Sequence, residues 1–146
     1  GNLAAIEKNY TLAKHYNRKA LDNLEYKMRH RALTNLAQFA LRENNTDEAR
    51  QLLYQSLQVN PDYCLSHFLL GSIHIRENKP KRAAEEFKKS LLNTCTSNVE
   101  GHYQLGLSYL KAKEFQKARA QFAYLLEQFP QTLQAQRAGE QLKDIP

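Results

Sequence analysis

The sequence predicts an all-α fold, a solenoid in which antiparallel helix pairs stack on one another and a C-terminal helix closes the stack. Three observations support this prediction. The 146 residues include five glycines and four prolines, about half the average usage, whereas a β sandwich or barrel needs many such turn residues. Small residues recur at Ala37, Gly71 and Gly106, with separations of 34 and 35 residues. An alanine follows each of them twelve positions later, so the intervals are those of a helix–turn–helix repeat.

Length and composition are those of one globular domain spanning residues 1–146. Hydrophobic residues make up 42% and charged residues 25% of the chain, which argues against disorder. No run of apolar residues is long enough to span a membrane as a helix, and no secretory leader is visible. The net charge is +6, but the basic residues are spread along the chain among acids, which is typical of solvated helix faces.

Residues 1–25 are predicted to form a partial repeat. Gly1 and Ala13 reproduce the interval of twelve residues, and Lys8–Tyr10 falls where the turn of a repeat belongs. Because Gly1 then lies midway through a first helix, the sequence looks like a piece of a longer protein. The second helix of this partial repeat is predicted to contain Ala13, Tyr16, Ala20 and Leu21.

Three complete repeats are predicted at 28–61, 62–96 and 97–130. In each, a leucine and a small residue on the first helix face an alanine and a bulky residue on the second. The small residues let two helices approach closely, and the bulky residues fill the remaining space. The residues predicted to pack in this way are Leu36, Ala37, Ala49, Leu53, Leu70, Gly71, Ala83, Phe87, Leu105, Gly106, Ala118 and Phe122.

The helix boundaries carry recognisable signals. Thr46 is predicted to cap the second helix of the first complete repeat, and Pro80 suits the first position of a helix. Ser97 and Glu100 have the spacing of a capping box. A closing helix is predicted at 131–144, because a solenoid needs a last element with a polar outer face. Its inner face is predicted to hold Leu133, Ala135, Ala138 and Leu142.

These units resemble the tetratricopeptide repeat (TPR), whose pattern is a bulky residue, Leu-Gly, Tyr, Ala, Phe and Pro at fixed positions over 34 residues. Ala40 and His74 depart from it by replacing the tyrosine, and Cys95 replaces one proline. The resemblance implies a right-handed superhelix whose first helices line a concave groove. It implies non-catalytic binding of a protein or peptide, with no cofactor.

By this resemblance, groove residues follow from their register on the first helices. Apolar residues dominate the second and third complete repeats, so the groove is predicted to take a segment with apolar and some acidic side chains. Phe68 and Tyr103 are the strongest candidates, because aromatic residues often anchor interfaces. The predicted groove residues are Arg31, Thr34, Asn35, Gln38, Arg42, Leu65, Phe68, Leu69, Ser72, Arg76, Tyr103, Gln104, Leu107 and Lys111. The competing interpretation for the leucines is packing between neighbouring helices.

One subclass of these repeats binds the terminal carboxylate of chaperones through lysine, arginine and asparagine side chains. The matching positions here hold none of these residue types, and one of them is acidic. That subclass is therefore set aside. The residues at these positions are Thr34, Gln38, Leu69, Glu100 and Gln104.

Two short segments are similar to the type IV pilus pilotin family. The first runs from Tyr26 to Ala37 with Arg29 and Arg31, and the second is Phe129-Pro130-Gln131-Thr132-Leu133. The resemblance implies an outer-membrane lipoprotein in the periplasm of a Gram-negative bacterium. Such a protein binds the pilus secretin subunit and helps it to assemble in, or reach, the outer membrane. Any lipid anchor would lie outside this chain, and a cytoplasmic location is the alternative.

Histidine and cysteine residues give no catalytic or metal-binding spacing. His67 and His102 occupy equivalent positions, which indicates packing. Cys64 and Cys95 are predicted at adjacent helix ends, where a disulfide is possible and suits an oxidising compartment. Two independent cysteines are the alternative.

Three further functions stay open beside the pilotin-like one. The first is a TPR adaptor of another secretion or regulatory complex. The second is a nucleic-acid-binding module, and the third is a domain of a larger enzyme. For the nucleic-acid reading the sequence offers only its net charge, so no nucleic-acid partner is expected.

Overall fold

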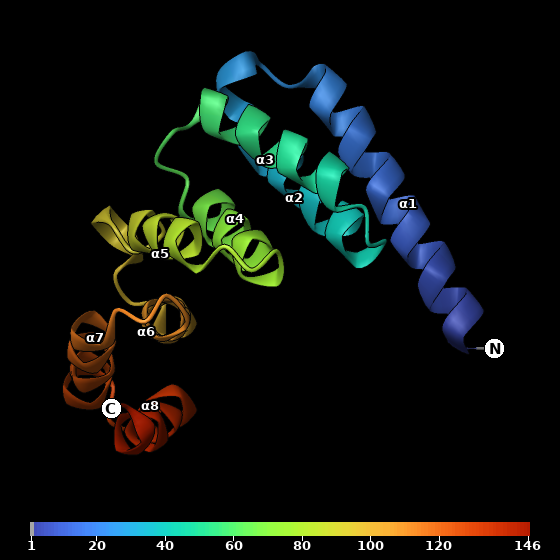
Figure 1. Cartoon of the computed structure of the whole chain (residues 1–146). Helices are drawn as coiled ribbons and strands as arrows, with labels where there is room; N and C mark the ends of the chain where they lie inside the picture. Colours follow the sequence, from blue (N-terminus) through green and yellow to red (C-terminus); the bar gives the residue numbers. More distant parts are fainter. Residues whose placement is uncertain (1) are drawn as a thin grey trace. The chain divides into compact units, whose positions relative to one another are not determined.

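The computed structural model describes residues 2–146, with side chains from Glu7 onward. Over that range the chain forms eight α-helices and two short 3-10 helices and contains no strand, so the predicted all-α fold is confirmed (Figure 1). The chain divides into two compact units, Gly1–Ser66 (unit 1) and His67–Pro146 (unit 2). The elements are α1 (Asn2–Asn23), η1 (Tyr26–Met28), α2 (His30–Arg42), α3 (Thr46–Val59), α4 (Cys64–Arg76), α5 (Pro80–Lys89), η2 (Asn93–Cys95), α6 (Val99–Lys111), α7 (Phe115–Gln128) and α8 (Leu133–Asp144).

The first helix corrects the predicted partial repeat. α1 is continuous over 22 residues, so the turn predicted at Lys8–Tyr10 does not form. No glycine or proline interrupts Asn2–Asn23, so nothing local ends the helix at the predicted turn. Instead α1 packs along α2, and the Tyr10 hydroxyl donates a 2.6 Å hydrogen bond to the Phe39 carbonyl.

The α2–α3 hairpin has the close contact that the repeat predicts. Ala37, Ala49 and Leu53 have no exposed surface, and Leu36 is 1% exposed. The predicted cap at Thr46 is wrong by one residue. Asn45 is the N-cap, and its side chain accepts a hydrogen bond from the Glu48 amide.

A cluster of buried hydroxyl groups lies in the same unit. Thr34, Ser56 and Ser66 have no exposed surface, and their hydroxyl oxygens lie 2.9 Å from one another in all three pairings. The Thr34 and Ser56 hydroxyls also donate to the His30 carbonyl, at 2.8 and 3.0 Å. Each hydroxyl carries one proton, so these two bonds leave the Ser66 hydroxyl as the donor within the cluster, and all three hydroxyls have a hydrogen-bond partner.

The turns between paired helices have the same backbone geometry in all three complete repeats. Asn44, Asn78 and Lys113 occupy equivalent positions and adopt left-handed backbone angles, with φ of 59°, 59° and 62°. The next amide donates back across the helix end, from Asn45 to Ala40, from Lys79 to His74 and from Glu114 to Tyr109, at 2.8 to 2.9 Å. These bonds satisfy carbonyls that the ends of α2, α4 and α6 would otherwise leave unpaired.

In both hairpins of unit 2, a glycine on the first helix packs against a phenylalanine ring on the second. A Cβ placed on Gly71 would lie 2.8 Å from the Phe87 ring, and one on Gly106 would lie 2.5 Å from the Phe122 ring. Both rings are fully buried. No side chain larger than hydrogen fits at either glycine without moving a ring, which is the reason for the residue predicted there.

The second helix of the middle repeat is shorter than predicted. α5 has 10 residues, against 14 in both α3 and α7. The chain leaves the helix after Lys89, Asn93 adopts a left-handed φ of 58°, and η2 ends at Cys95. Cys95 therefore ends a short 3-10 turn, whereas the sequence predicted that it would end the helix itself.

The last two elements close unit 2. Asn98 caps α6, its side chain accepting from the Gly101 amide, so the predicted cap at Ser97 is wrong by one residue. α8 packs on α7 and α6, and Ala135 and Ala138 are buried as predicted. Leu133, predicted on the same face, is 55% exposed because it begins the helix beyond the contact.

Candidate partner-binding site

The structure separates the predicted groove residues into those that are free to contact a partner and those that the fold already uses. Thr34 belongs to the second group. It has no exposed surface, and its hydroxyl donates to the His30 carbonyl and lies 2.9 Å from the hydroxyl oxygens of Ser56 and Ser66. Thr34 is therefore a core residue of unit 1, and its prediction as a groove residue is wrong.

The first helix contacts two further groove candidates. The Asn35 amide donates to the Asn17 side chain at 3.3 Å, and the Arg42 guanidinium lies 4.7 Å from the centre of the Tyr10 ring. Arg31 and Gln38 on the same helix are exposed. A partner on this part of α2 has to share it with α1.

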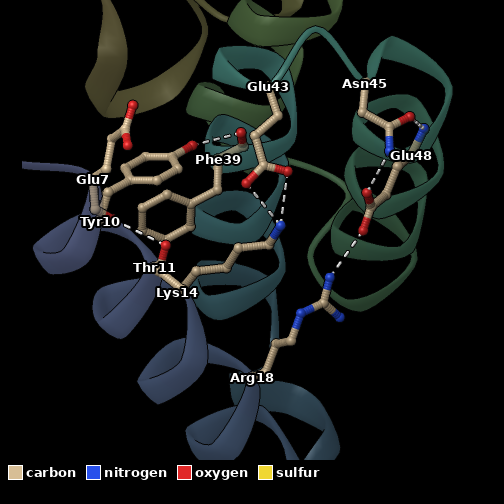
Figure 2. A network of polar contacts seen from close by, with 9 residues as sticks. All are labelled: Glu7, Tyr10, Thr11, Lys14, Arg18, Phe39, Glu43, Asn45 and Glu48. Atoms are coloured by element: carbon tan, nitrogen blue, oxygen red, sulfur yellow. Dashed lines mark hydrogen bonds and ion pairs between the residues drawn. The ribbon is translucent and has the colours of Figure 1, made fainter. Parts of the chain in front are cut away.

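Within unit 1, ion pairs connect α1 to the turn after α2 and to the start of α3 (Figure 2). Lys14 contacts both carboxylate oxygens of Glu43 at 2.8 and 2.9 Å, and Arg18 lies 2.9 Å from Glu48. The Asn45 side chain contacts the same Glu48 carboxylate at 2.8 Å. The turn between α2 and α3 is therefore neutralised by cations of α1.

Tyr103, one of the two strongest candidates, is also a core residue. It is 7% exposed and packs in one cluster with Phe122 of α7 and Ala138 of α8. Gln104 donates to Glu100 at 2.9 Å, and Gln134 of α8 donates to the same carboxylate at 3.0 Å. Because α8 packs across this part of α6, Tyr103 cannot anchor a partner.

The other strong candidate, Phe68, is partly buried. Its ring centre lies 5.6 Å from that of Phe87 in an edge-on arrangement, and it packs against the core cluster of α5 and α6. The Ser72 hydroxyl donates to the Phe68 carbonyl of its own helix at 3.1 Å. Both residues therefore contribute to the fold as well as to the surface of α4.

The residues left for a partner in unit 2 come from α4 and α6. Leu69 and Leu107 are half-buried, and Arg76 and Lys111 are exposed at the ends of their helices. Leu107 packs in part against the last core cluster. In unit 1, Leu65 is half-buried as well. Whether any of these residues contacts a partner stays a prediction.

Both repeat-equivalent histidines have structural partners. His67 Nδ1 donates to the Glu86 carboxylate at 2.7 Å. His102 Nε2 donates to the Thr96 carbonyl at 2.7 Å, while its Nδ1 lies 3.1 Å from the Gln121 amide nitrogen. A carbonyl only accepts, so Nε2 of His102 carries the proton and Nδ1 accepts from Gln121. Both histidines tie the first helix of a repeat to the second.

Burial and these contacts shift the pKa values of two groups in this region. Burial raises the pKa of the Glu86 carboxyl, but the hydrogen bond and positive charge of His67 oppose it, and the net pKa lies below the usual value. Burial lowers the pKa of His74, whose Nδ1 has no hydrogen-bond partner within residues 7–146. In that same range no group of three or more His, Cys, Asp or Glu side chains has a geometry that suits a metal ion.

The two cysteines are both oxidised. Neither Cys64 nor Cys95 is a free thiol, and each is disulfide-bonded. The interpretation of two independent thiols is therefore excluded in this structure. Among the described helices, none is both long and apolar enough to cross a bilayer.

Sequence reasoning missed a basic cavity in unit 2. It has a volume of about 590 Å³ and is lined by Lys79, Pro80, Lys81, Arg82 and Ala112. The sequence does contain a signal for this cavity. The start of α3 holds the acidic residues Asp47 and Glu48, whereas the equivalent positions at the start of α5 hold the basic residues Lys81 and Arg82. Comparing charges between equivalent turns would have located the site.

Known proteins match this chain over its repeats. Two family models described as tetratricopeptide repeat match residues 35–99 and 99–132. Together they cover more than half of the chain, and it belongs to the tetratricopeptide repeat family. A stretch of 72 residues is 31% identical to protein O-mannosyl-transferase TMTC3 of Mus musculus. The matched stretch makes up 49% of this chain and 8% of that protein. The chain thus spans a small part of the curated relative that it matches.

Solved structures agree on the fold. The pilF protein of Pseudomonas aeruginosa aligns with a TM-score of 0.76 and 16% identity, covering 97% of this chain and 63% of that one. The second TPR domain of human RPAP3, solved in complex with the HSP70 peptide SGPTIEEVD, aligns with a TM-score of 0.67 and 14% identity, covering 76% of this chain and 92% of that domain. Proteins of this fold are typically non-enzymatic interaction scaffolds that bind peptides or proteins.

Proposed function

We propose that this chain is a non-catalytic, pilotin-like factor that binds the pilus secretin subunit and assists its assembly or localisation at the outer membrane. The observation that carries the proposal is the similarity in fold to pilF over 97% of the chain. The two pilotin-like segments, at Tyr26–Ala37 and Phe129–Leu133, support it.

The two segments differ in what the fold requires of them. Thr132 caps α8 by accepting from the Ala135 amide, and Arg29 donates to the Leu24 carbonyl at 3.2 Å. Tyr26 is 63% exposed on η1. The fold explains Thr132 and Arg29 without a partner, whereas an exposed tyrosine is a favourable anchor for one.

The oxidised cysteines support a periplasmic location. Disulfides persist in the periplasm and are rare in the cytosol of mesophiles. Titration of the denatured, unreduced protein with a thiol reagent is expected to find no free thiol at Cys64 or Cys95. Two thiols per chain in protein purified from the periplasm would remove this support.

A pull-down of secretin-subunit fragments by the oxidised chain tests the proposed function. The double variant Leu69→Ala with Leu107→Ala is expected to lose binding, because it removes apolar contact area on α4 and α6. Leu12→Ala with Leu126→Ala is the matched control, since both leucines are exposed, at 48% and 39%, and lie outside the predicted groove and both pilotin-like segments. Tyr26→Ala is expected to weaken binding without lowering the melting temperature.

Two outcomes of this experiment would overturn the proposal. One is the absence of binding by the wild-type chain. The other is equal binding by the groove variant and the control variant, which would leave only a general TPR adaptor. The match to TMTC3 favours, as a second candidate, a repeat segment of a larger protein, for which no secretin binding is expected.

A further inference from the structure

The basic cavity of unit 2 lies at the turn between α4 and α5. Three of its five lining residues, Lys79, Lys81 and Arg82, carry positive charge, and the other two, Pro80 and Ala112, are apolar. All three cationic residues are exposed. A hollow of about 590 Å³ has the size of a site for a few side chains of a ligand.

Of the three cations that line this cavity, Lys79 is the one with an ion pair among the described residues. Lys79 lies 4.0 Å from Glu77, at the outer limit of an ion pair. Among the described residues, neither Lys81 nor Arg82 takes part in an ion pair or a side-chain hydrogen bond. Like charges that face one cavity repel each other, and an anionic ligand removes that repulsion.

The repeat register shows that the fold does not require cations here. Lys81 and Arg82 are equivalent to Asp47 and Glu48 of unit 1, which lie 34 residues earlier. Those acids occupy the first turn of α3, where the positive end of the helix dipole favours them. The first turn of α5 contains no acid, so its two cations are placed against the dipole. Residues that oppose local stability at an exposed cavity are typical of a binding site.

We propose that this cavity binds an acidic segment of a partner polypeptide. The Arg82 guanidinium can form two parallel hydrogen bonds with one carboxylate, and the lysines add charge without a fixed geometry. Pro80 and Ala112 give apolar contact for the methylene groups of glutamate. The inference rests on the proposed function as a protein-binding scaffold, and it adds a site outside the predicted groove.

The lining favours a peptide over a nucleic acid. Proteins that bind single strands stack bases on aromatic side chains and follow the backbone along an extended groove. Pro80 and Ala112 are the uncharged residues of this lining, and neither offers a stacking surface. Binding of a nucleic acid is therefore an outcome that the experiment has to exclude.

Fluorescence anisotropy with a labelled decapeptide of alternating glutamate and alanine tests the proposal. The same peptide with glutamine in place of glutamate is the control probe. We expect the wild-type chain to bind the glutamate peptide and not the glutamine peptide. Affinity should fall as salt rises from about 50 mM to about 200 mM, because exposed charges are screened over a Debye length of about 8–10 Å.

The decisive variant is Lys81→Asp with Arg82→Glu, which gives α5 the acidic pair that starts α3. We expect the dissociation constant for the glutamate peptide to rise about tenfold or more, with an unchanged or higher melting temperature. Arg137→Glu with Lys143→Asp is the matched control. Both residues are exposed on α8 and lie outside the cavity lining, so this variant makes the same change in net charge and should bind within about twofold of wild type.

Three results would overturn the proposal: equal binding of both peptides, equal affinity of the two double variants, or tighter binding of a single-stranded oligonucleotide of the same charge. Failure here is distinguishable from failure of the secretin proposal. Leu69→Ala with Leu107→Ala should leave binding of the glutamate peptide intact, since neither leucine lines the cavity. A chain that binds the peptide but no secretin fragment would retain this site and lose the pilotin-like function.

Discussion

Different side chains fill the space between the paired helices in unit 1 and in unit 2. In unit 1 an alanine faces a leucine, and Thr34 places a hydroxyl beside them. In unit 2 a glycine faces a phenylalanine, and the positions equivalent to Thr34 hold Phe68 and Tyr103, which pack on those rings. A repeat therefore conserves the volume between its helices rather than the identity of the residues.

The volume argument predicts a rescue within the last hairpin, which is the largest effect expected. Gly106→Ala places a Cβ 2.5 Å from the Phe122 ring. Overpacking of this kind lowers the free energy of unfolding by about 1–3 kcal/mol. The higher helix propensity of alanine offsets about 1 kcal/mol of that loss. Phe122→Leu leaves a gap. Combining the two substitutions reproduces the pair of unit 1, so the double variant should lose less stability than the sum of the single variants.

Urea unfolding of the four proteins in this cycle measures the coupling. We expect an interaction free energy of about 1 kcal/mol or more in favour of the double variant. Strict additivity of the two losses would show that the hairpins of the two units are not interchangeable in this way.

The hydroxyl cluster of unit 1 predicts a loss that comes from one missing hydrogen-bonding group. Thr34→Val keeps the shape of the side chain but removes one member of the cluster, and we expect a cost of about 1–2 kcal/mol in the free energy of unfolding. Ser72→Ala is the control in unit 2, because the Ser72 hydroxyl bonds only to its own helix. A Thr34→Val protein as stable as the Ser72→Ala protein would mean that the cluster is not a stabilising feature of unit 1.

The third comparison concerns one position that holds Ala40, His74 and Tyr109 in the three repeats, and it predicts the smallest effect. Burial lowers the pKa of His74 from 6.5. The unfolded chain therefore binds a proton at a higher pH than the folded chain, and the folded state loses stability as pH falls below about 6.5. That loss continues down to the pKa of the folded state.

Substituting His74→Tyr removes this titration and installs the residue of the last repeat. Melting temperatures measured between pH 8 and pH 5 should fall less for this variant than for the wild-type chain. His15→Tyr is the control, because His15 is exposed on α1. Parallel pH profiles for the His74 variant and the wild type would exclude a contribution from His74.

Much of the architecture could be predicted from the sequence because repeated spacing encodes local and neighbouring contacts. The intervals that begin at Ala37, Gly71 and Gly106 located the three close helix contacts, and the closing helix was placed correctly. The caps at Asn45 and Asn98 were missed by one residue, since adjacent Asn, Ser and Thr side chains are similar candidates and only backbone angles choose among them. The continuity of α1 was missed because the interval between Gly1 and Ala13 fits the repeat by coincidence.

The candidate site was less predictable for a physical reason. Register gives the face of a helix on which a residue lies, but it does not reveal which other helix covers that face. Tyr103 has the right register for a groove, yet α8 packs over it, and Asn35 and Arg42 are contacted by α1. The basic cavity likewise arises where the turn before α5 meets the end of α6, which are about 30 residues apart.

By itself, the sequence determined the helical repeat, the small-to-large pairing inside each hairpin and the family to which the chain belongs. Periodic spacing carries this information because residues of one hairpin are close in the chain. Only the tertiary structure decided which predicted groove residues are buried, where α5 ends and where Lys79, Lys81 and Arg82 gather around a cavity. Those features depend on contacts between elements distant in sequence, and no local pattern records them.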